Sequence, residues 1–395
     1  MRILFDLFTP QDFVGGAGEY VRRVFYTLLD VVKDEKLDVE IVAMVDSSFA
    51  NGRFAYTDLC PENLRRIGVE VADIKDKKLA EVLALYRIDK VFIGAAQYWG
   101  ERFDLSGLNC PVICVVHDLC DEEFADSHVE DALRLNSIPA LLKAKVRSYL
   151  RGLKHPNRGV KRMLPIMEQA RRNSSFRIVT VSNYTKNCLA YHFGYDPGRV
   201  DVLFSPHRVN RTEDKIENAS LDALVRSGQK YYLMLSANRV SKNAEKALRA
   251  FERFAEIDSK QSVFVTVGYP QSRFPRHMVL PYLCEGDLAF AMKHCYALVF
   301  PSIFEGFGYP PVEAMSYGKP VLAANVTSIP EVLGDAPIYF SPFYESDIYR
   351  ALSVLNAENY EGYVSKSVVR SAEVGHRQQA DLKQLISLLV DSNCC

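Results

Sequence analysis

Short apolar runs alternate with helical stretches along nearly the whole chain of 395 residues. The runs are rich in Val and Ile at consecutive positions, which is typical of parallel strands that helices cover on both faces. Strands and helices in alternation predict an α/β fold with parallel sheets. In the first half, strands are expected at Ile3–Phe8, Val39–Val45, Val69–Ile74, Lys90–Ala95, Val112–His117, Ile178–Val181 and Val200–Ser205. In the second half, they are expected at Tyr232–Ala237, Val263–Gly268, Ala297–Pro301, Pro320–Ala324 and Ile338–Phe340.

The length of the chain predicts two domains, because one hydrophobic core rarely spans so many residues. A polar stretch without periodicity, Ser205–Asn218, separates the two groups of strands. We therefore expect two doubly wound, Rossmann-like domains, one over residues 1–208 and the other over residues 209–372. Ligands of open α/β sheets bind beyond the carboxyl ends of the strands, so two such domains are expected to face a central ligand cleft.

Composition excludes several classes of protein. With 48% hydrophobic and 25% charged residues, the chain resembles an ordinary soluble globular protein, and its net charge of −1 argues against nucleic-acid binding. The 9 cysteines are scattered without a Cys-x-x-Cys pair, which favours reduced thiols over disulfides or zinc. The start, MRILFDLFTP, is broken by an acid and predicts a strand rather than a signal peptide. No apolar run reaches the ~18 residues of a membrane helix, so a cytoplasmic protein is expected.

Two glutamates lie on either side of a glycine turn in the stretch VFPSIFEGFGYPPVEA, residues 299–314. Glu305 follows an expected strand, and the turn is Gly306-Phe307-Gly308. Pro310 and Pro311 then open a helix that is expected to carry Glu313 in its first turn.

The start of that helix favours phosphate, because its N–H groups are free and its end is positive. Carboxylates repel phosphate, so the two glutamates are better suited to accept hydrogen bonds from the hydroxyls of a sugar or a ribose. The stretch therefore predicts a sugar–phosphate site, and the alternative is a plain strand–loop–helix joint with two solvated glutamates.

Two cations stand in another expected strand-to-helix loop, Leu235–Asn243. Arg239 offers a planar fork for phosphate oxygens, and Lys242 adds a compact point charge. The alternative is a solvated capping loop.

A glycine loop follows the first expected strand, where Gly15-Gly16-Ala17-Gly18 precedes a helical pattern. Glycines permit positive φ angles and close approach of the backbone to a ligand. The loop also resembles a dinucleotide fingerprint, with Asp46 at the end of the second strand. Val21 replaces the third glycine and Thr9–Val14 is long for that turn, so a nicotinamide site is not favoured.

Further candidates stand after expected strands or before an expected helix. His117 and Asp118 follow one strand of the first half, and Trp99, a candidate for the acceptor pocket, follows another. Tyr282 and Leu283 precede a helix with acids at its start. For each of them, plain packing is the alternative.

The segment from Glu305 to Glu313 resembles the Glu-x7-Glu signature of the retaining nucleotide-sugar glycosyltransferases of family 4 (group 1), which adopt the GT-B fold. The other motifs agree in order and spacing, so the resemblance covers nearly the whole chain. It implies a C-terminal helix within residues 373–395, centred on Gln378–Leu389, that packs back toward the first domain. The chain differs from the family pattern after Val200–Ser205, where it has Ser205-Pro206-His207 and the family often has Asn-Gly.

The resemblance also implies roles for the candidate residues. The catalytic set would be Glu305, His117, Arg239 and Lys242. Donor-binding residues would be Gly15, Gly16, Glu313, Gly306, Phe307, Gly308, Leu283 and Tyr282. Asp118 and Trp99 would lie on the acceptor side. No Asp-x-Asp triplet occurs, so we expect a metal-independent enzyme with no cofactor, whose donor substrate is a nucleotide-sugar.

A basic segment indicates where the acceptor comes from. Lys143–Arg172 holds ten Lys and Arg residues and a single acid, with apolar residues interleaved at helical spacing. Such a segment suggests an anionic membrane surface or a lipid diphosphate, and the alternative is a solvated face. With the resemblance, it implies a glycan or lipid-linked glycan acceptor and transfer in bacterial surface polysaccharide synthesis, either O-antigen or capsule, at the inner face of the membrane.

Two other functions stay open at this stage. One is a nucleotide-sugar 2-epimerase of the same fold. The other is a catalytically silent partner subunit, against which the presence of both glutamates, Lys242 and His117 argues.

Overall fold

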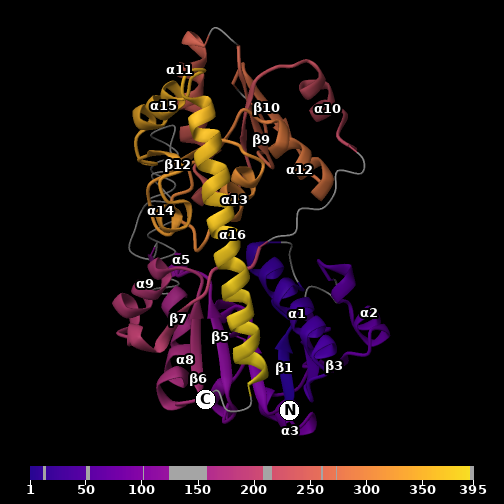
Figure 1. The fold of residues 1–395 in the computed structure, drawn as a ribbon. Helices are drawn as coiled ribbons and strands as arrows, with labels where there is room; N and C mark the ends of the chain where they lie inside the picture. The colour runs from indigo at the N-terminus through magenta and orange to yellow at the C-terminus, as the bar shows by residue number, and fades with distance from the viewer. Residues whose placement is uncertain are drawn as a thin grey trace. The chain divides into compact units, whose positions relative to one another are not determined.

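Two wholly parallel sheets organise the chain, one in each half of the sequence (Figure 1). The structure is a computed structural model and describes residues 1–11, 15–49, 54–100, 102–123, 158–207, 216–258, 261–272 and 274–391. The described residues of Met1–Ala125, Asn157–Arg208 and Arg377–Cys395 form one compact unit, and those of Val209–His376 form the other. The predicted domain boundaries at 208 and 372 stay predictions.

The first sheet has seven strands in the order β3-β2-β1-β4-β5-β6-β7. The strands are β1 (Arg2–Asp6), β2 (Glu40–Val45), β3 (Glu70–Asp73), β4 (Lys90–Ile93), β5 (Val112–Val116), β6 (Phe176–Thr180) and β7 (Val200–Val202). Its order reverses beside β1, which pairs with β2 on one side and with β4 on the other.

The second sheet has six strands in the order β10-β9-β8-β11-β12-β13. They are β8 (Tyr231–Met234), β9 (Val263–Val267), β10 (His277–Leu280), β11 (Ala297–Phe300), β12 (Val321–Ala324) and β13 (Ile338–Phe340). Here the order reverses between β8 and β11, which pair directly.

Helices connect the strands. The first unit contains α1 (Gly16–Asp34), α2 (Pro61–Arg66), α3 (Leu79–Leu85), α4 (Ala96–Trp99), α5 (Cys120–Glu123), α8 (Arg158–Arg172) and α9 (Asn183–Phe193). The second contains α10 (Ala219–Arg226), the short η5 (Val240–Lys242), α11 (Ala244–Ile257), α12 (Glu285–His294), α13 (Tyr309–Ser316), α14 (Ile329–Leu333) and α15 (Glu345–Val354). The last helix, α16 (Tyr360–Val390), has residues in both units.

The strand pattern of the sequence is confirmed. Every expected strand is present, and Ile338–Phe340 has the expected bounds. The strand β10 was not predicted, because its four residues lie between prolines at positions 275 and 281 and show no long apolar run. The strands are buried on most positions because helices cover both faces of each sheet.

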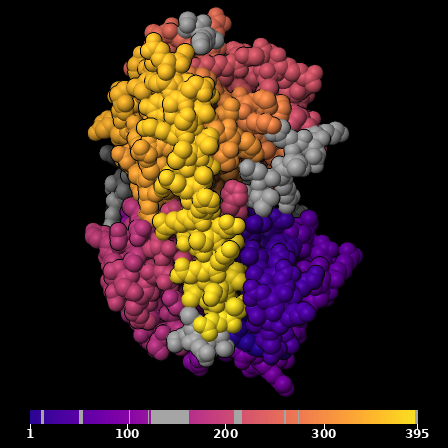
Figure 2. All heavy atoms as spheres, viewed as in Figure 1, coloured from indigo at the N-terminus to yellow at the C-terminus, as the bar shows by residue number. Residues whose placement is uncertain are grey.

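The C-terminal part of α16 is bound to the first unit. Gln378 donates from Nε2 to the carbonyl of Ser205 (2.7 Å), and Asp381 accepts from the Phe204 N–H (2.7 Å). Figure 2 shows the yellow atoms of this part between the indigo N-terminal atoms and the magenta atoms of the segment that contains β7. The helix is longer than the predicted Gln378–Leu389, since its first half lies in the second unit.

Lys90, the first residue of β4, is almost fully buried beside the end of that helix. Its ammonium group donates to the carbonyls of Leu388 (3.0 Å), Leu389 (3.2 Å) and Asp391 (2.5 Å). The last carbonyls of a helix have no partner within the helix and form its negative end, so a cation satisfies both needs.

Among the described residues, no helix is long and apolar enough to cross a membrane. The described cysteines are all free. The basic segment Lys143–Arg172 lies outside the described residues up to position 157, and the rest of it forms α8.

Candidate functional site

The reversal point of the second sheet gathers the charged residues predicted for the donor site. Lys242 follows β8 and Glu305 follows β11, the two strands between which the order reverses. At such a point the loops of neighbouring strands run to opposite faces of the sheet, which opens a crevice at the carboxyl edge. The two residues therefore stand where doubly wound sheets bind their ligands.

Lys242 and Glu305 form a buried ion pair. The Lys242 Nζ donates to Glu305 Oε1, and the two side chains are only 10% and 15% exposed. The ammonium group also lies 5.0 Å from the centre of the Phe300 ring, whose face attracts cations. The Glu305 bond uses one of the three N–H donors of the ammonium, so two remain for ligand oxygens.

The loop that carries Lys242 is held in a specific conformation. Asn243 has a left-handed backbone (φ 59°, ψ 34°), which Asn tolerates better than most residues. Its side chain donates to the Pro342 carbonyl (2.8 Å). The Ser241 carbonyl accepts from the Ile303 N–H (2.8 Å), which ties this loop to the one that carries Glu305.

The glycine turn after Glu305 has the predicted form. Gly308 has a φ of +89°, a conformation that glycine adopts without cost, and it directly precedes α13. The helix begins at Tyr309, one residue before the two prolines, so its N-terminus opens at the turn. The expectation that Glu313 lies in the first helical turn is wrong, because this earlier start places it in the second turn. Glu313 is nevertheless buried, at 7% exposure.

The second predicted cation differs from Lys242 in its surroundings. Arg239 directly precedes η5, and its side chain is exposed, whereas Lys242 at the end of η5 is buried. Both residues lie on the loop after β8, as their spacing in the sequence predicted. Only Lys242 is held by an ion pair to a second predicted site residue.

Three adjacent strand ends bring Tyr282 to the same edge. The Tyr282 hydroxyl donates to Asn238 Oδ1 (2.9 Å), on the loop after β8. Gly268, at the end of β9, has a φ of +82°, and a Cβ there would stand 3.2 Å from the Tyr282 ring. The ring is 66% exposed and Leu283 is half-buried, so this segment presents an aromatic face at the edge of the sheet.

In the first unit, Gly15 and Gly16 stand at the start of α1. Gly15 precedes the helix with an extended backbone (φ −166°), and Gly16 is its first helical residue. Neither residue uses the positive φ that glycine permits. Both residues lack a side chain, and this property would let a ligand approach the start of α1 closely.

His117 follows β5 and faces inward. Its Nε2 lies 2.9 Å from the Gly94 carbonyl, and its ring meets the Tyr20 ring edge to face at 4.8 Å. A carbonyl can only accept, so Nε2 carries the proton of the neutral ring. Burial lowers the pKa of His117 to about 4, and the Gly94 bond opposes this shift only in part. The His117 carbonyl accepts from the Thr185 hydroxyl (3.2 Å), and the adjacent Asp118 accepts from the Cys120 N–H (3.1 Å).

A buried carboxylate at the end of β1 was not predicted as a site residue. Asp6 is fully buried and accepts from the Thr9 N–H, the Gly94 N–H and the Trp99 Nε1–H, at 2.9, 3.0 and 2.8 Å. Burial raises its pKa although these bonds oppose the rise. Because Gly94 binds both Asp6 and His117, the three residues link the ends of β1, β4 and β5.

The same bonds give Trp99 a packing role. Trp99 has no exposed surface and belongs to the core of the first unit, with its single polar atom bound to Asp6. The structure therefore places it away from the exposed position that a contact with an acceptor needs.

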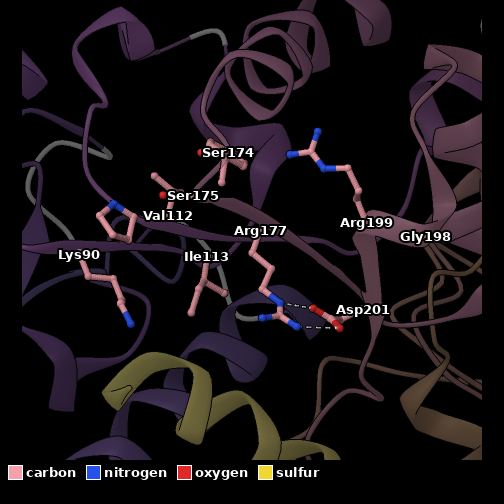
Figure 3. A pocket seen from close by; sticks show the side chains of 11 residues that line it. Lys90, Val112, Ile113, Ser174, Ser175, Arg177, Gly198, Arg199 and Asp201 are labelled. Atoms are coloured by element: carbon pink, nitrogen blue, oxygen red, sulfur yellow. Dashed lines mark hydrogen bonds and ion pairs between the residues drawn. The ribbon is translucent and has the colours of Figure 1, made fainter. Parts of the chain in front are cut away.

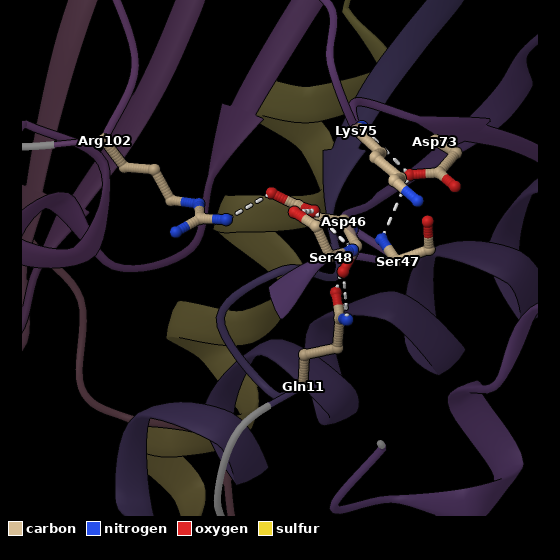
Figure 4. A network of polar contacts seen from close by, with 7 residues as sticks. All are labelled: Gln11, Asp46, Ser47, Ser48, Asp73, Lys75 and Arg102. Carbon is tan, nitrogen blue, oxygen red and sulfur yellow. Dashed lines mark hydrogen bonds and ion pairs between the residues drawn. The ribbon is translucent and has the colours of Figure 1, made fainter. Parts of the chain in front are cut away.

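Asp46 does not present a carboxylate to a ribose. Figure 4 shows its side chain between Arg102 and Ser48. Arg102 forms an ion pair with it, Ser48 donates to it through its N–H and hydroxyl, and Gln11 bonds its backbone (2.6 and 2.9 Å). These bonds from Arg102 and Ser48 lower the pKa of Asp46 despite its burial, which acts in the opposite direction. This network holds the loops after β1 and β2 together and disfavours the dinucleotide interpretation.

A separate cavity of about 220 Å³ lies at the amino ends of β4, β5 and β6 (Figure 3). Lys90, Arg177, Arg199 and Asp201 line it, and the Arg177 side chain is bound to Asp201. None of the predicted site residues lines this cavity. It belongs to the opposite edge of the sheet from His117.

The comparisons with known proteins agree with this geometry. Residues 216–347 match the model of the family described as glycosyl transferases group 1, and this range includes Lys242, Glu305 and Glu313. The serotype-specific mannosyltransferase WbdA of Escherichia coli is 32% identical over 124 residues, which cover 31% of this chain and 13% of WbdA. The O-antigen chain mannosyltransferase B of Escherichia coli is 27% identical over 207 residues, which cover 48% of this chain and 53% of the relative. The chain thus spans about half or less of these curated relatives.

A solved structure extends the likeness to the whole chain. Anabaena HepE, determined in complex with UDP-glucose, superimposes with a TM-score of 0.63 over 98% of this chain and 99% of HepE, at 13% identity. At this identity the likeness shows the fold. It agrees with the two parallel sheets and confirms the predicted α/β architecture of two Rossmann-like domains, the GT-B fold.

Proposed function

We propose that this chain, which carries a group 1 glycosyltransferase domain over residues 216–347, transfers a hexose from a nucleotide-sugar to a glycan or lipid-linked glycan. The proposal includes retention of the anomeric configuration, independence of metal ions and membership of family 4. One observation carries it: the Lys242–Glu305 ion pair stands at the reversal point of the sheet inside the matched segment. The names of the relatives support mannose as the sugar.

Charge that develops on the departing diphosphate needs positive groups. Lys242 supplies a fixed ammonium, Arg239 an exposed guanidinium on the same loop, and the residues Gly306–Gly308 and the start of α13 supply N–H groups. Donors fixed before the reaction are typically worth about 10²–10³ in rate each. This arrangement needs no metal ion to balance the leaving group.

The two glutamates have different tasks in this proposal. Glu305 accepts hydrogen bonds from the hydroxyls of the donor sugar and fixes the Lys242 ammonium beside it. Glu313, deeper in α13, accepts from the hydroxyls of the ribose. Tyr282 and Leu283 flank the nucleotide base at the ends of the neighbouring strands.

The transfer step exchanges one bond for another at the anomeric carbon. The bond from that carbon to the diphosphate oxygen breaks on the same face on which the acceptor oxygen bonds, and the leaving phosphate oxygen takes the acceptor proton. In this proposal the neutral His117 belongs to the catalytic set, Gly15 and Gly16 contact the donor, and Asp118 contacts the acceptor. No covalent intermediate with the protein is required.

Support for the setting comes from the relatives and from the basic segment. The mannosyltransferase B relative acts on the O-antigen chain, as its name states. The acceptor proposed here is accordingly a growing surface polysaccharide on a lipid carrier, with the enzyme at the inner face of the membrane. The basic segment Lys143–Arg172 would contribute the contact with anionic lipid.

The test is turnover with a panel of nucleotide-sugars and lipid-linked glycans, with products identified by NMR. We expect one donor, a mannose nucleotide, to give glycosylated acceptor with retained configuration. Inversion of configuration, epimerised donor without transfer, or the absence of any turnover would overturn the proposal.

A further inference from the structure

We infer that Thr327 and Ser328 are positioning residues for Glu305, which they hold by its main chain from the next strand. The inference rests on the proposed function for its catalytic meaning. The two residues stand on the loop after β12, the strand that pairs with β11 on the side away from β8.

Both main-chain groups of Glu305 are bonded to this loop. The Glu305 N–H donates to the Thr327 hydroxyl (3.3 Å), and its carbonyl accepts from the Ser328 hydroxyl (2.8 Å). The N–H and the carbonyl lie on either side of one Cα atom. Because both are held, the direction of the Glu305 Cα–Cβ bond is fixed before any ligand arrives.

The Ser328 hydroxyl donates to Glu305 and does not cap its own helix. Ser328 is the N-cap residue of α14, a position where a serine side chain ordinarily accepts from a free N–H of the first turn. No such bond forms here, and the one contact of the hydroxyl of this fully buried residue that is described is its donation to Glu305. The described contact of this side chain thus holds Glu305 and contributes no cap to α14.

The backbone conformation of Thr327 is unfavourable for a threonine. Its φ is +55°, and a β-branched residue in the left-handed region is strained. Glycine or asparagine would fit this backbone with less strain, but neither carries the hydroxyl that meets the Glu305 N–H. The strain thus accompanies a contact to a proposed catalytic residue.

The loop of Glu305 is held from its other side as well. The Ile303 N–H donates to Ser241, beside Lys242 on the loop after β8. The neighbouring strands on both sides of β11 therefore fix the segment between them, and the Lys242–Glu305 ion pair forms within that frame. Loss of the Thr327 or Ser328 bond should loosen Glu305 and leave Lys242 in place.

Three variants of Thr327 separate positioning from stability. Thr327→Val keeps the strained backbone and removes the hydroxyl, Thr327→Gly relieves the strain and removes the hydroxyl, and Thr327→Ser keeps the hydroxyl. We expect kcat to fall about three- to tenfold in the Val and Gly variants, with little change in the KM for donor, and to recover in the Ser variant. Thr327→Gly should have a higher melting temperature than Thr327→Val. Activity that follows the melting temperature instead of the hydroxyl would overturn the inference.

Ser328→Ala provides an independent arm, and Ser353→Ala is its matched control. Ser353 makes a hydroxyl-to-carbonyl bond of similar length (2.9 Å, to Tyr349) on the exposed face of α15. We expect kcat to fall about three- to tenfold for Ser328→Ala alone. An equal effect of the two changes would contradict the positioning role.

A measurement without turnover keeps this inference separate from the proposed function. Amide hydrogen exchange at Glu305, followed by NMR, should be at least several-fold faster in Thr327→Val, Thr327→Gly and Ser328→Ala than in the wild type. Unchanged exchange would overturn the inference even in an active enzyme. Faster exchange in a protein that transfers no sugar would uphold the positioning of Glu305 and overturn the proposed function.

Discussion

At the scale of single residues, the Lys242–Glu305 pair combines two charges at a place that water hardly reaches. Removing charged groups from water costs several kcal/mol, which the attraction between them repays only in good geometry. Such a pair is weak evidence for stability. Its position at the reversal point of the sheet explains it better as part of a ligand site.

Because the Lys242–Glu305 pair is buried, removal of one partner should destabilise the folded protein. We expect Glu305→Gln to lower the free energy of unfolding by about 3 kcal/mol, because it leaves the Lys242 ammonium without its counter-charge. The double variant Lys242→Met with Glu305→Gln should recover part of this loss in urea unfolding.

A surface pair offers the control for that measurement. Arg226 and Asp222 form an ion pair in α10 with side chains 78% and 32% exposed. Arg226→Ala should cost less than about 1 kcal/mol. A comparable loss at both pairs would contradict the buried character of Lys242 and Glu305.

Turnover and donor binding should separate the two glutamates. Glu305→Ala is expected to lower kcat about 10²–10³-fold, because it removes the proposed contact to the reacting sugar and the ion-pair partner of Lys242. Glu313→Ala should mainly raise the Kd for the donor, measured by calorimetry, because its proposed partner is the ribose. Near wild-type turnover in the Glu305 variant would remove this residue from the site.

His117 should make the first unit sensitive to acid. Its pKa in the folded protein is about 4, below the value of 6.5 expected when unfolded, so only the unfolded state gains the proton between these values. Stability from this group is complete above pH 6.5 and falls by on the order of 3 kcal/mol as the pH approaches 4. The difference in unfolding free energy between wild type and His117→Gln should shrink accordingly toward pH 4. A difference independent of pH would refute this origin.

Sequence reasoning succeeded for residues whose position depends on a strand end. Lys242 and Glu305 each follow a predicted strand, and parallel strands bring such residues to one edge. Tyr282 was predicted only from its place before a helix, because the strand β10 that precedes it was missed. The same reasoning missed Asp6 and Thr327. The contacts of Asp6 with Trp99 and Gly94 depend on packing between strands far apart in sequence, and threonine gives no signal for a positive φ.

At the scale of elements, the end of α16 depends on one lysine. Lys90 donates to three carbonyls there, and it does so from the first residue of a buried strand. A lysine at that position looks like a strand boundary in the sequence. Its role emerges only when a helix from the other end of the chain lies beside it.

Removal of this cation should loosen the helix end. Lys90→Met keeps the apolar stem and leaves the carbonyls without their charged donor, so we expect a loss of about 1–3 kcal/mol in urea unfolding. Faster amide exchange in the last turn of α16 should accompany it. Lys383→Met, at an exposed position of the same helix, is the control and should have little effect. Equal losses would show that Lys90 acts by charge alone.

Burial decides which elements the sequence pattern predicts. Strands with long apolar runs, such as β5 and β12, were predicted because both of their faces are covered. The edge strand β10 was missed, because it is short and half of its residues are only partly buried. The first half of α16 was missed because its exposed, polar residues give little amphipathic contrast.

At the scale of the whole molecule, the chain contains two units with separate sheets and a predicted donor site in the second. A nucleoside diphosphate should therefore slow amide exchange at the loops after β8 and β11, between residues 236 and 243 and between 303 and 309. At a hundredfold excess over Kd, binding adds about 2.7 kcal/mol to the stability of the folded state. Protection confined to the loops after β1 and β5 would place the nucleotide in the first unit and contradict the prediction of a donor site in the second.

The end of the chain returns to the unit that contains its beginning. Residues 377–391 of α16 belong to the first unit, where they bond to Phe204, Ser205 and Lys90. A polypeptide cut between residues 207 and 216 would leave the amino-terminal piece short of a helix that its own sheet requires. Circular permutation has the opposite effect. Joining the last turn of α16 to Met1 by a linker and opening new ends at that cut would place residues 377–391 next in sequence to the strand β1 of their own unit.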